Sequence, residues 1–417
     1  MNHVLIIVEN LAVPFDRRVW QEANSLTEDG IKVSVICPKM KGYTRSFESI
    51  NNIDIYRHPL PLEAKGAMGY ILEYLTAFLW ELYLSIRIFI WNRFQIIQGC
   101  NPPDLIFLVA LFFRPLGVKY IFDHHDINPE LYIAKYGKKG FFYRLLLLAE
   151  RLTFKTAHYS IATNESYRQI ALTRGRMRGA RVQVVRSGPN LDRLKITAGD
   201  IRYKSGRKFL VGYVGVIGEQ EGLDLLLESV RSIVGSRHDI QFAIVGGGTE
   251  LGRITRLAEQ LGVAAYVDFY GRVDDATLID ILNTADVCVN PDRPTEMNDL
   301  STMNKIMEYM ALKKPIVQYD LKEGRYSAQK ASLYAVNTDP IDFAKKITFL
   351  IDNPEIGREM GKFGFKRVTS ELSWAFEGAK LKEFYKRIFE EKGVKKEAQL
   401  LPHPRLTYSH PVNENLP

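Results

Sequence analysis

Cysteine is scarce in this chain: among its 417 residues only Cys37, Cys100 and Cys288 are present. The three lie far apart, in or beside apolar runs, so they indicate neither a disulfide framework nor the short ligand spacing of a metal site. We therefore expect a reducing compartment and no metal ion.

The chain also lacks a basic leader and a long uncharged apolar run. The N-terminal run "HVLIIV" is short and follows no basic residue, so it predicts a first strand rather than a signal peptide. The longest apolar stretch, residues 68–94, is interrupted by Glu73, Glu81 and Arg87, whereas a membrane-spanning helix needs roughly 20 apolar residues. We expect a cytoplasmic protein that spans no membrane.

Residues 68–94 nevertheless form a helical pattern that is rich in aromatic residues. Such residues favour a membrane interface, but a helix of this composition can equally belong to the core of a domain. Both interpretations stay open, and the first would place the protein on the inner face of the cell membrane. The aromatic residues are Tyr70, Tyr74, Trp80, Tyr83 and Trp91.

The composition is that of an ordinary globular protein, with 46% hydrophobic and 25% charged residues. The net charge is +8, and part of the surplus is a cluster of arginines in one short stretch. Such a cluster can meet an anionic lipid, a diphosphate or only solvent, and without interleaved aromatic residues it does not favour nucleic acid. The clustered residues are Arg174, Arg176, Arg178, Arg181 and Arg186.

Apolar runs that resemble parallel strands alternate with helical patterns, which is typical of α/β architecture. The series starts again after residues 191–208, a charged stretch without periodicity that we interpret as a linker. We therefore predict two Rossmann-like domains, residues 1–190 and 209–370. An amphipathic helix (371–392) and a polar tail without a core face (393–417) follow.

The stretch "STMNKIMEYMALKKPIVQYD", residues 301–320, predicts a short amphipathic helix with Ser301 as its N-cap. Apolar residues recur at the spacing of a core-facing stripe, which leaves Lys305 and Glu308 on the other face. These two can form a simple surface ion pair or can serve a ligand. The stripe consists of Met303, Ile306, Met307, Met310 and Ala311.

Ligands of doubly wound sheets bind beyond the carboxyl ends of the strands, where the N-termini of helices direct their amides. Ser301, Thr302 and the first helical amides, beginning near Asn304, can then hold phosphate oxygens. Lys305 would add a positive charge, and Glu308 could accept hydrogen bonds from sugar hydroxyls.

Several segments together resemble bacterial glycosyltransferases of family 4, from the N-terminus to about Glu391. This resemblance implies a GT-B fold, with two facing Rossmann-like domains and a C-terminal helix that crosses back to the first. It also implies sugar transfer from a nucleotide-sugar with retention of configuration and without a cofactor. The segments include "DHHDINPELYIAKYG", "IATNESYRQIALTRG", "YVGVIGEQEGLDLLLESV" and "NDLSTMNKIMEYMALKKPIV".

The resemblance also implies roles for particular residues. Glu308 matches a glutamate that bonds the ribose of the donor, and His125 matches a histidine beside the donor sugar. Residues 13–18 match a loop on the acceptor side. The members of this loop that we place in the site are Asp16, Arg17 and Arg18, and the glycines that let the chain approach the donor are Gly215, Gly246 and Gly247.

Two departures from the family pattern stand out. Leu300 occupies the position of a first motif glutamate, so Asp299 or Asn298 would have to make that contact with the sugar. The basic residues that usually clamp the diphosphate would fall near Val216 and Glu221, neither of which is basic.

The missing clamp leaves two interpretations. We favour replacement by Lys305, the helix N-terminus and Arg272, and the alternative is an impaired donor site. The first predicts a hexosyl- or N-acetylhexosaminyltransferase acting on a lipid-linked or soluble saccharide in surface polysaccharide synthesis. A nucleotide-sugar epimerase and a non-catalytic partner subunit are the competing functions.

Overall fold

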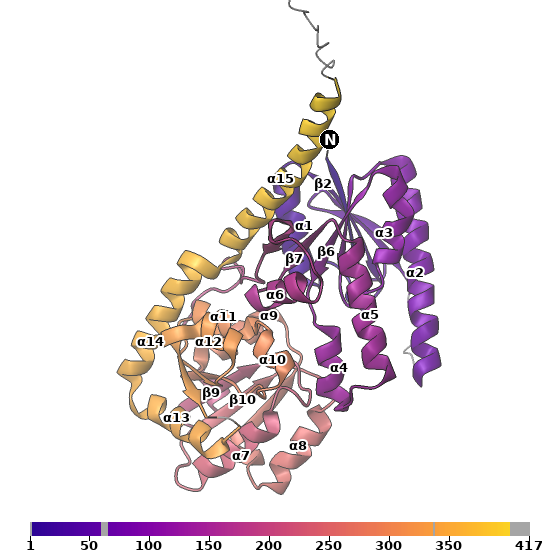
Figure 1. Cartoon of the computed structure of the whole chain (residues 1–417). Coiled ribbons are helices and arrows are strands. Elements are labelled where there is room, and N and C mark those ends of the chain that lie inside the picture. The colour runs from indigo at the N-terminus through magenta and orange to yellow at the C-terminus, as the bar shows by residue number, and fades with distance from the viewer. Residues whose placement is uncertain (1, 60–65, 337, 401–417) are drawn as a thin grey trace, which may run out of the picture.

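The computed structural model describes residues 2–59, 66–336 and 338–400, which form two α/β domains with one sheet each (Figure 1). The sheet of the first domain has the order β3-β4-β2-β1-β5-β6-β7-β8 and is parallel except for β3. Its strands are β1 (His3–Val8), β2 (Lys32–Pro38), β3 (Phe47–Ile50), β4 (Ile53–His58), β5 (Ile96–Cys100), β6 (Lys119–His124), β7 (Tyr159–Ala162) and β8 (Val182–Val184).

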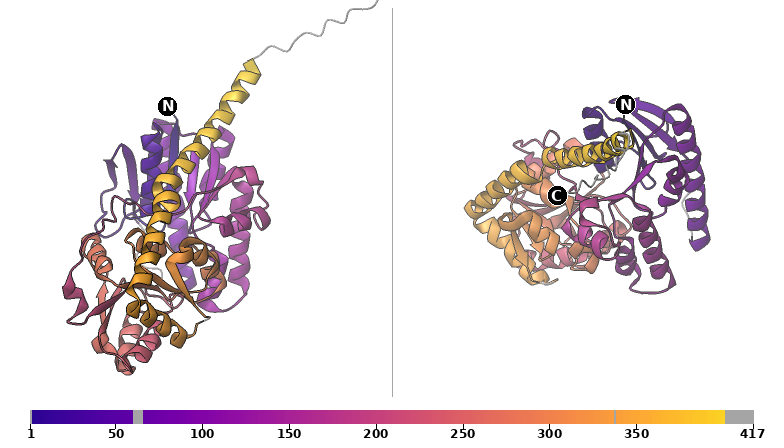
Figure 2. Two further views of the ribbon diagram at one scale, coloured as in Figure 1. Left: turned by 90° about the vertical axis from the view of Figure 1, so that its left-hand side faces the viewer. Right: turned by 45° about the horizontal axis from the view of Figure 1, so that its top comes forward.

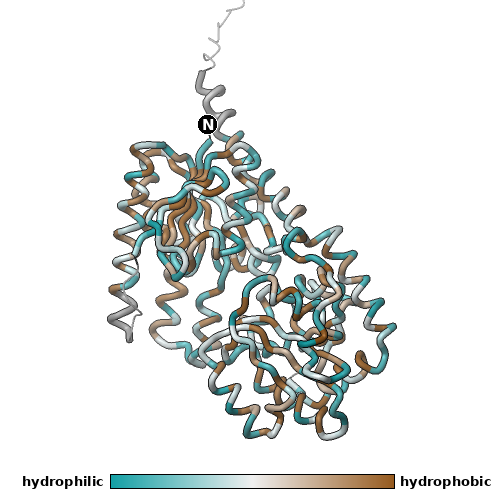
Figure 3. Tube along the Cα trace, turned by 180° about the vertical axis from the view of Figure 1, so that it is seen from behind, coloured by the Kyte–Doolittle hydropathy of each residue, from teal (hydrophilic) through white to brown (hydrophobic). Residues whose placement is uncertain are grey.

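Helices cover both faces of this first sheet, as its buried strands require. One face packs on α1 (Arg17–Glu28). The other packs on α2 (Gly66–Trp91), α3 (Phe107–Phe113), α5 (Phe141–Thr156) and α6 (Glu165–Thr173), while α4 (Asn128–Tyr136) follows β6. Figure 3 shows the hydrophobic segments gathered in the strands between these helical layers.

The second domain contains a fully parallel sheet in the order β11-β10-β9-β12-β13-β14. Its strands are β9 (Phe209–Val214), β10 (Ile240–Val245), β11 (Val267–Gly271), β12 (Val287–Asn290), β13 (Ile316–Tyr319) and β14 (Ser332–Ala335). Its helices are α7 (Leu223–Val234), α8 (Leu251–Gln260), α9 (Asp275–Thr284), α10 (Glu296–Leu300), α11 (Asn304–Ala311), α12 (Lys322–Ala328), α13 (Pro340–Asp352) and α14 (Pro354–Arg367).

The last helix, α15 (Trp374–Leu400), leaves the second domain and crosses back over the first, as Figures 1 and 2 show. Leu381, Phe384 and Ile388 are buried against the face that α1 covers. Trp374 Nε1 donates to Ser25 Oγ at 3.0 Å. The predicted fold of two facing domains and a crossing helix is confirmed. The tail was expected from residue 393, but the helix continues to residue 400, and the rest of that tail lies outside the described residues.

The stretch expected as a linker packs closely on the second domain. The amide of Thr197 donates to Asn283 Oδ1 at 3.2 Å, and the amide of Asp200 donates to Thr284 Oγ1 at 2.7 Å. Both acceptors lie at the C-terminal end of α9. These bonds fix the path of the stretch, including Arg193, which enters the site described below.

Helix α2 contains the aromatic stretch for which the sequence allows both a membrane interface and a domain core. By length and composition alone, its segment Leu72–Trp91 could cross a membrane despite its charged residues, so the expectation that the protein spans no membrane stays a prediction. In the fold, Leu84 and Ile88 pack on the first sheet. Only 28% of the apolar segment within Leu72–Trp91 is buried, which is less than expected for a helix in the core of a domain.

Candidate functional site

Glycines form the edge of the second sheet where β9 and β10 end. Gly246 has a φ of +141°, and a Cβ atom there would lie 1.8 Å from the carbonyl oxygen of Gly215. A Cβ atom at Gly215 would lie 3.3 Å from Lys305 Cε, and one at Gly247 would lie 3.3 Å from Arg272 Cγ. Only glycine fits at Gly246. The structure thus brings together five residues that we placed at the donor.

The N-terminus of α11 lies next to this edge and differs from its prediction. The helix begins at Asn304, and Met303 takes the N-cap position without a side-chain hydrogen bond, so the prediction of Ser301 as the cap is wrong. The Ser301 hydroxyl instead donates to the Met297 carbonyl oxygen at 2.7 Å and lies 3.0 Å from the Tyr167 hydroxyl. Because the first amides of a helix have no intrahelical acceptor, those of α11 can bind an anion.

Thr302 connects the two domains. Its Oγ1 accepts from Asn164 Nδ2 at 3.1 Å and from Arg186 Nη1 at 3.2 Å. The hydroxyls of Ser301 and Thr302 therefore contact first-domain side chains, and their role at phosphate oxygens stays a prediction. Asn304 is exposed at the first helical position.

Lys305 lies beneath the glycine edge. Its Nζ donates to Asp292 Oδ1 at 2.8 Å and lies 4.9 Å from the centre of the Tyr213 ring. The side chain of Lys305 is 11% exposed and that of Asp292 is 1% exposed. Burial raises the pKa of Asp292, and the Lys305 charge opposes this rise. Lys305 thus pairs with Asp292, and the alternative of a surface pair with Glu308 is wrong.

Glu308 lies in a network of charges that joins the domains. Its carboxylate forms an ion pair with Arg193, and its Oε1 lies 3.6 Å from Arg17 Nη1. Arg17 also pairs with Asp275 at the start of α9, and Arg193 Nη1 lies 3.2 Å from the same carboxylate. A donor ribose at Glu308 would meet these two guanidinium groups.

His125 belongs to a buried polar cluster at the end of β6. Its Nε2 lies 2.8 Å from Asp123 Oδ2 and 3.0 Å from Arg18 Nε. Arg18 Nη2 lies 2.9 Å from Glu22 Oε1 and 3.1 Å from Asp123 Oδ1. Gln98 Nε2 donates to both acids, at 2.6 Å to Glu22 Oε2 and 2.7 Å to Asp123 Oδ2. Each side chain of this cluster is therefore held by a hydrogen bond or an ion pair to another member.

Burial and charge together set the protonation of this cluster. Burial lowers the pKa of His125, but the Asp123 carboxylate outweighs this effect, and the net pKa is raised above 6.5. Burial raises the pKa of Glu22 to about 8 although Arg18 opposes it. For Asp123, burial acts upward, yet His125 and Arg18 hold its pKa well below the usual range. The cluster therefore favours an ionised Asp123 beside a protonated His125.

The same cluster has the chemistry of a metal site. Ligand atoms of Glu22, Cys100, Asp123 and His125 all lie within 4.8 Å of one another. However, the Arg18 guanidinium contacts both carboxylates and already supplies the positive charge that they need. A metal ion would fit only if Arg18 moved away.

The residues predicted on the acceptor side have different surroundings. Asp16 is the N-cap of α1, where its Oδ1 accepts from the Val19 amide at 3.1 Å. Arg17 forms an ion pair with Asp275 of the second domain. Arg18 is 8% exposed and contacts the His125 cluster, so its surroundings differ from those of Arg17, and its contact with an acceptor stays a prediction.

Asp299 and Asn298, the candidates for the missing motif glutamate, both serve local structure. Asp299 Oδ1 accepts from the Lys322 amide at 2.8 Å and so stabilises the start of α12. The Nδ2 of Asn298 donates to the carbonyl oxygens of Gln220 and Arg293, each at 2.9 Å.

The sequence analysis missed Asp292, Arg193 and Glu22. A signal existed only for Glu22, which lies four residues after Arg18 and hence on the same face of α1. Asp292 and its partner Lys305 are 13 positions apart with α10 between them, and Arg193 and Glu308 are 115 positions apart, so no helical or strand spacing reveals these pairs.

Two family models match consecutive parts of the chain. The model described as "Glycosyl transferase 4-like domain" matches residues 16–188, and that described as "Glycosyl transferases group 1" matches residues 208–353. With the two facing domains and the crossing helix, these matches define the class as the GT-B glycosyltransferases. Within this class, the two matches are consistent with the predicted resemblance to glycosyltransferase family 4.

Curated relatives and solved structures agree with this assignment. Alpha-D-kanosaminyltransferase of Streptomyces kanamyceticus is 22% identical over 190 residues, 45% of this chain and 48% of that protein. D-inositol 3-phosphate glycosyltransferase of Corynebacterium jeikeium is 23% identical over 225 residues, 50% of this chain and 52% of that protein. The chain thus spans about half the length of the curated relatives it matches.

The solved structures share the fold over nearly the whole chain. Sucrose-phosphate synthase of Thermosynechococcus elongatus superposes with a TM-score of 0.78 at 18% identity, covering 94% of this chain and 100% of that one. HepE of Anabaena, in complex with UDP and glucose, gives a TM-score of 0.70 at 12% identity, covering 92% and 99%.

Proposed function

We propose that the protein is a retaining glycosyltransferase that transfers a hexosyl or N-acetylhexosaminyl group from a nucleotide-sugar to a saccharide, without a metal or other cofactor. The observation that carries this proposal is the N-terminus of α11, which lies with Lys305 beside the glycine edge. Helix amides and a lysine together suit a diphosphate. The UDP and glucose bound by HepE support a donor of this class.

The charges around the N-terminus of α11 suggest how the reaction proceeds. Departure of the nucleoside diphosphate leaves negative charge next to α11 and Lys305, which stabilise it electrostatically. We propose front-side attack of the acceptor hydroxyl on the anomeric carbon, with the leaving diphosphate accepting the proton of that hydroxyl. His125, whose pKa the neighbouring Asp123 carboxylate raises, orients the sugar beside the anomeric carbon.

We further propose a lipid-linked saccharide as the acceptor, in surface polysaccharide synthesis at the cytoplasmic face of the membrane. Support comes from α2, whose exposed aromatic residues include Trp80 and Trp91. A non-catalytic partner subunit is the second candidate, because Lys305 and Glu308 are both engaged by protein charges.

The test has two stages. A thermal-shift panel of nucleotide-sugars on the purified protein should identify a donor by a rise in unfolding temperature. NMR of the product formed with a saccharide acceptor should then show the anomeric configuration of the donor retained. If calorimetry detects no nucleotide-sugar binding, the protein is the partner subunit, and an inverted product refutes the retaining mechanism.

A further inference from the structure

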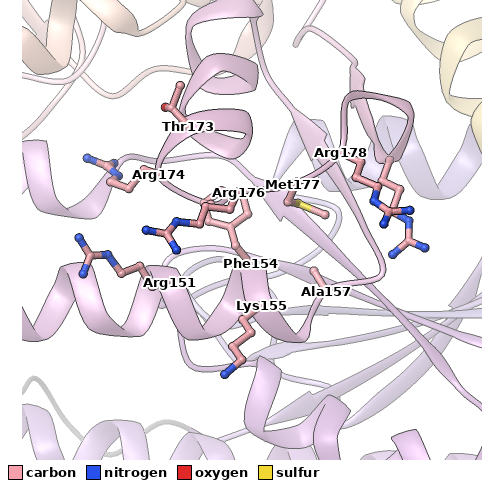
Figure 4. Close-up of a pocket in the computed structure, with 11 residues that line it drawn as sticks. Arg151, Phe154, Lys155, Ala157, Thr173, Arg174, Arg176, Met177 and Arg178 are labelled. Atoms are coloured by element: carbon pink, nitrogen blue, oxygen red, sulfur yellow. The ribbon is translucent and has the colours of Figure 1, made fainter.

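A cationic cavity opens on the first domain, away from the donor site. It has a volume of about 840 Å³ and lies between the end of α5 and the loop that follows α6, as Figure 4 shows. None of its lining residues belongs to α11 or to the His125 cluster. Its cationic lining residues are Arg151, Lys155, Arg174, Arg176, Arg178 and Arg181.

Protein carboxylates neutralise only one of these cations. Arg174 bonds Glu130 at 2.5 Å and Glu150 at 2.7 Å. Within the described part of the chain, the other five side chains form no hydrogen bond or ion pair, and no acidic residue lines the cavity. A concave surface with so many unmatched positive charges is suited to an anionic partner.

The outer face of α5 adds an apolar component to this surface. Its exposed apolar residues recur at the helical spacing i, i+4, i+7 and i+11. Two of the cavity cations, Arg151 and Lys155, lie on the same exposed side, and the one acidic residue of the helix, Glu150, is buried. The exposed apolar residues are Phe141 (75%), Leu145 (49%), Leu148 (51%) and Leu152 (38%).

Neighbouring helices continue the apolar surface. Helix α3 contacts both α2 and α5, and Figure 1 shows the three on the same outer side of the first sheet. An exposed apolar surface of this extent is unusual for a protein that has no partner there. The exposed residues on α2 are Leu72, Leu75, Leu79, Trp80, Tyr83, Ile90 and Trp91, and those on α3 are Leu108, Leu111 and Phe112.

We propose that α5 and the cationic cavity form a membrane-docking site that binds the phosphate headgroups of anionic phospholipids. The apolar residues of α5, α3 and α2 then enter the interfacial layer beside the headgroups. A basic amphipathic helix with no exposed acid has this property in general, whereas a soluble phosphate would need the cations alone. The inference rests on the proposed function and deepens it, because docking would bring the proposed active site close to a lipid-linked acceptor.

The experiment measures sedimentation with vesicles of phosphatidylcholine, with and without phosphatidylglycerol, at low and high salt. The cavity variant Arg176→Glu/Arg178→Glu/Arg181→Glu should lose affinity for the anionic vesicles by at least roughly tenfold. A control variant with the same change in net charge, Arg256→Glu/Lys330→Glu/Lys345→Glu on the second domain, should bind like the parent. Equal losses in both variants would show a net-charge effect and overturn the proposal.

A second variant distinguishes lipid from soluble phosphate. Leu145→Ser/Leu148→Ser/Leu152→Ser, which keeps every cation, should also weaken vesicle binding. If it binds like the parent and inorganic phosphate abolishes binding, the cavity is a phosphate site and membrane docking is refuted. Circular dichroism establishes that each variant folds. If the cavity variant does not fold, Arg→Gln changes replace its Arg→Glu changes.

The docking proposal and the proposed activity can be refuted independently of each other. Transfer to a soluble saccharide, assayed without vesicles, should be the same in the cavity variant as in the parent. A parent that binds anionic vesicles but transfers no sugar refutes the proposed function alone. A parent that transfers sugar but does not bind the vesicles refutes the docking alone.

Discussion

At the scale of single residues, His125 is held on three sides. Its ring contacts Asp123 and Arg18, and its amide donates to Asn101 Oδ1 at 2.6 Å. We predict that His125→Ala lowers kcat by roughly 100-fold or more, a loss typical of removing a positioned catalytic group. Donor affinity in calorimetry should change little, because the proposed diphosphate site lies in the other domain. An unchanged kcat would remove His125 from the site.

The buried Glu22 makes stability depend on pH. Its pKa is raised from 4.5 to about 8 by burial, so the folded protein retains a proton that the unfolded chain has lost. The unfolding free energy should therefore fall as pH rises from about 5 to 8, by up to about 1.4 kcal/mol per pH unit. The raised pKa of His125 acts in the same direction above pH 6.5.

Glu22→Gln, which imitates the protonated acid, should make this pH profile flatter in chemical unfolding experiments. Asp54→Asn, a change at a partly exposed carboxylate on β4, is the matched control and should keep the slope of the parent. A Glu22→Gln variant with the full slope would show that Glu22 is ionised in the folded state.

At the scale of elements, the N-terminus of α11 depends on the Lys305–Asp292 pair. Lys305→Ala should weaken nucleotide-sugar binding by about 1.5–3 kcal/mol, the range for a hydrogen bond to a charged group. It should also destabilise the fold, because Asp292 is then buried without its partner.

The double variant Lys305→Ala/Asp292→Asn separates these effects. Its unfolding temperature should return toward that of the parent, while its donor affinity stays low. Donor affinity restored in the double variant would mean that Lys305 acts only as the partner of Asp292.

Glu308 links α11 to the linker and to α1. Glu308→Gln should reduce turnover with the fold intact, because a neutral amide is a weaker acceptor for the ribose hydroxyls. Asp275→Asn is the matched control, since it weakens the same charge network without changing Glu308. Similar losses in the two variants would assign the effect to the contact between domains.

The helices and strands themselves were largely predictable, because apolar residues recur along the chain in patterns typical of each. Fully buried strands such as β1 and β9 read as continuous apolar runs, and α11 reads as an amphipathic stripe. The N-cap of α11 was not predictable, because the Ser301 hydroxyl has a competing acceptor in the preceding helix. The partner of Glu308 is 115 positions away in Arg193, and no local pattern encodes such a pairing.

At the scale of the whole molecule, α15 joins the stability of the two domains. It follows α14 of the second domain in the chain, yet Trp374 at its start packs on the core of the first domain, Phe384 is 1% exposed in that core, and Tyr385 donates a hydrogen bond to Gln98 in the His125 cluster. Removing a buried phenylalanine side chain costs about 3–5 kcal/mol. Phe384→Ala should therefore destabilise the first domain in particular.

Calorimetry can separate this effect from a general loss of stability. The parent should unfold in one transition, whereas Phe384→Ala should show an earlier transition of the first domain that a bound nucleotide-sugar does not shift. Phe343→Ala, in the core of the second domain, is the control and should lower the unfolding temperature of the domain with the proposed donor site. If Phe384→Ala keeps one transition that the donor shifts as in the parent, α15 does not couple the domains. The contacts of α15 would then only cover the apolar face of the first sheet.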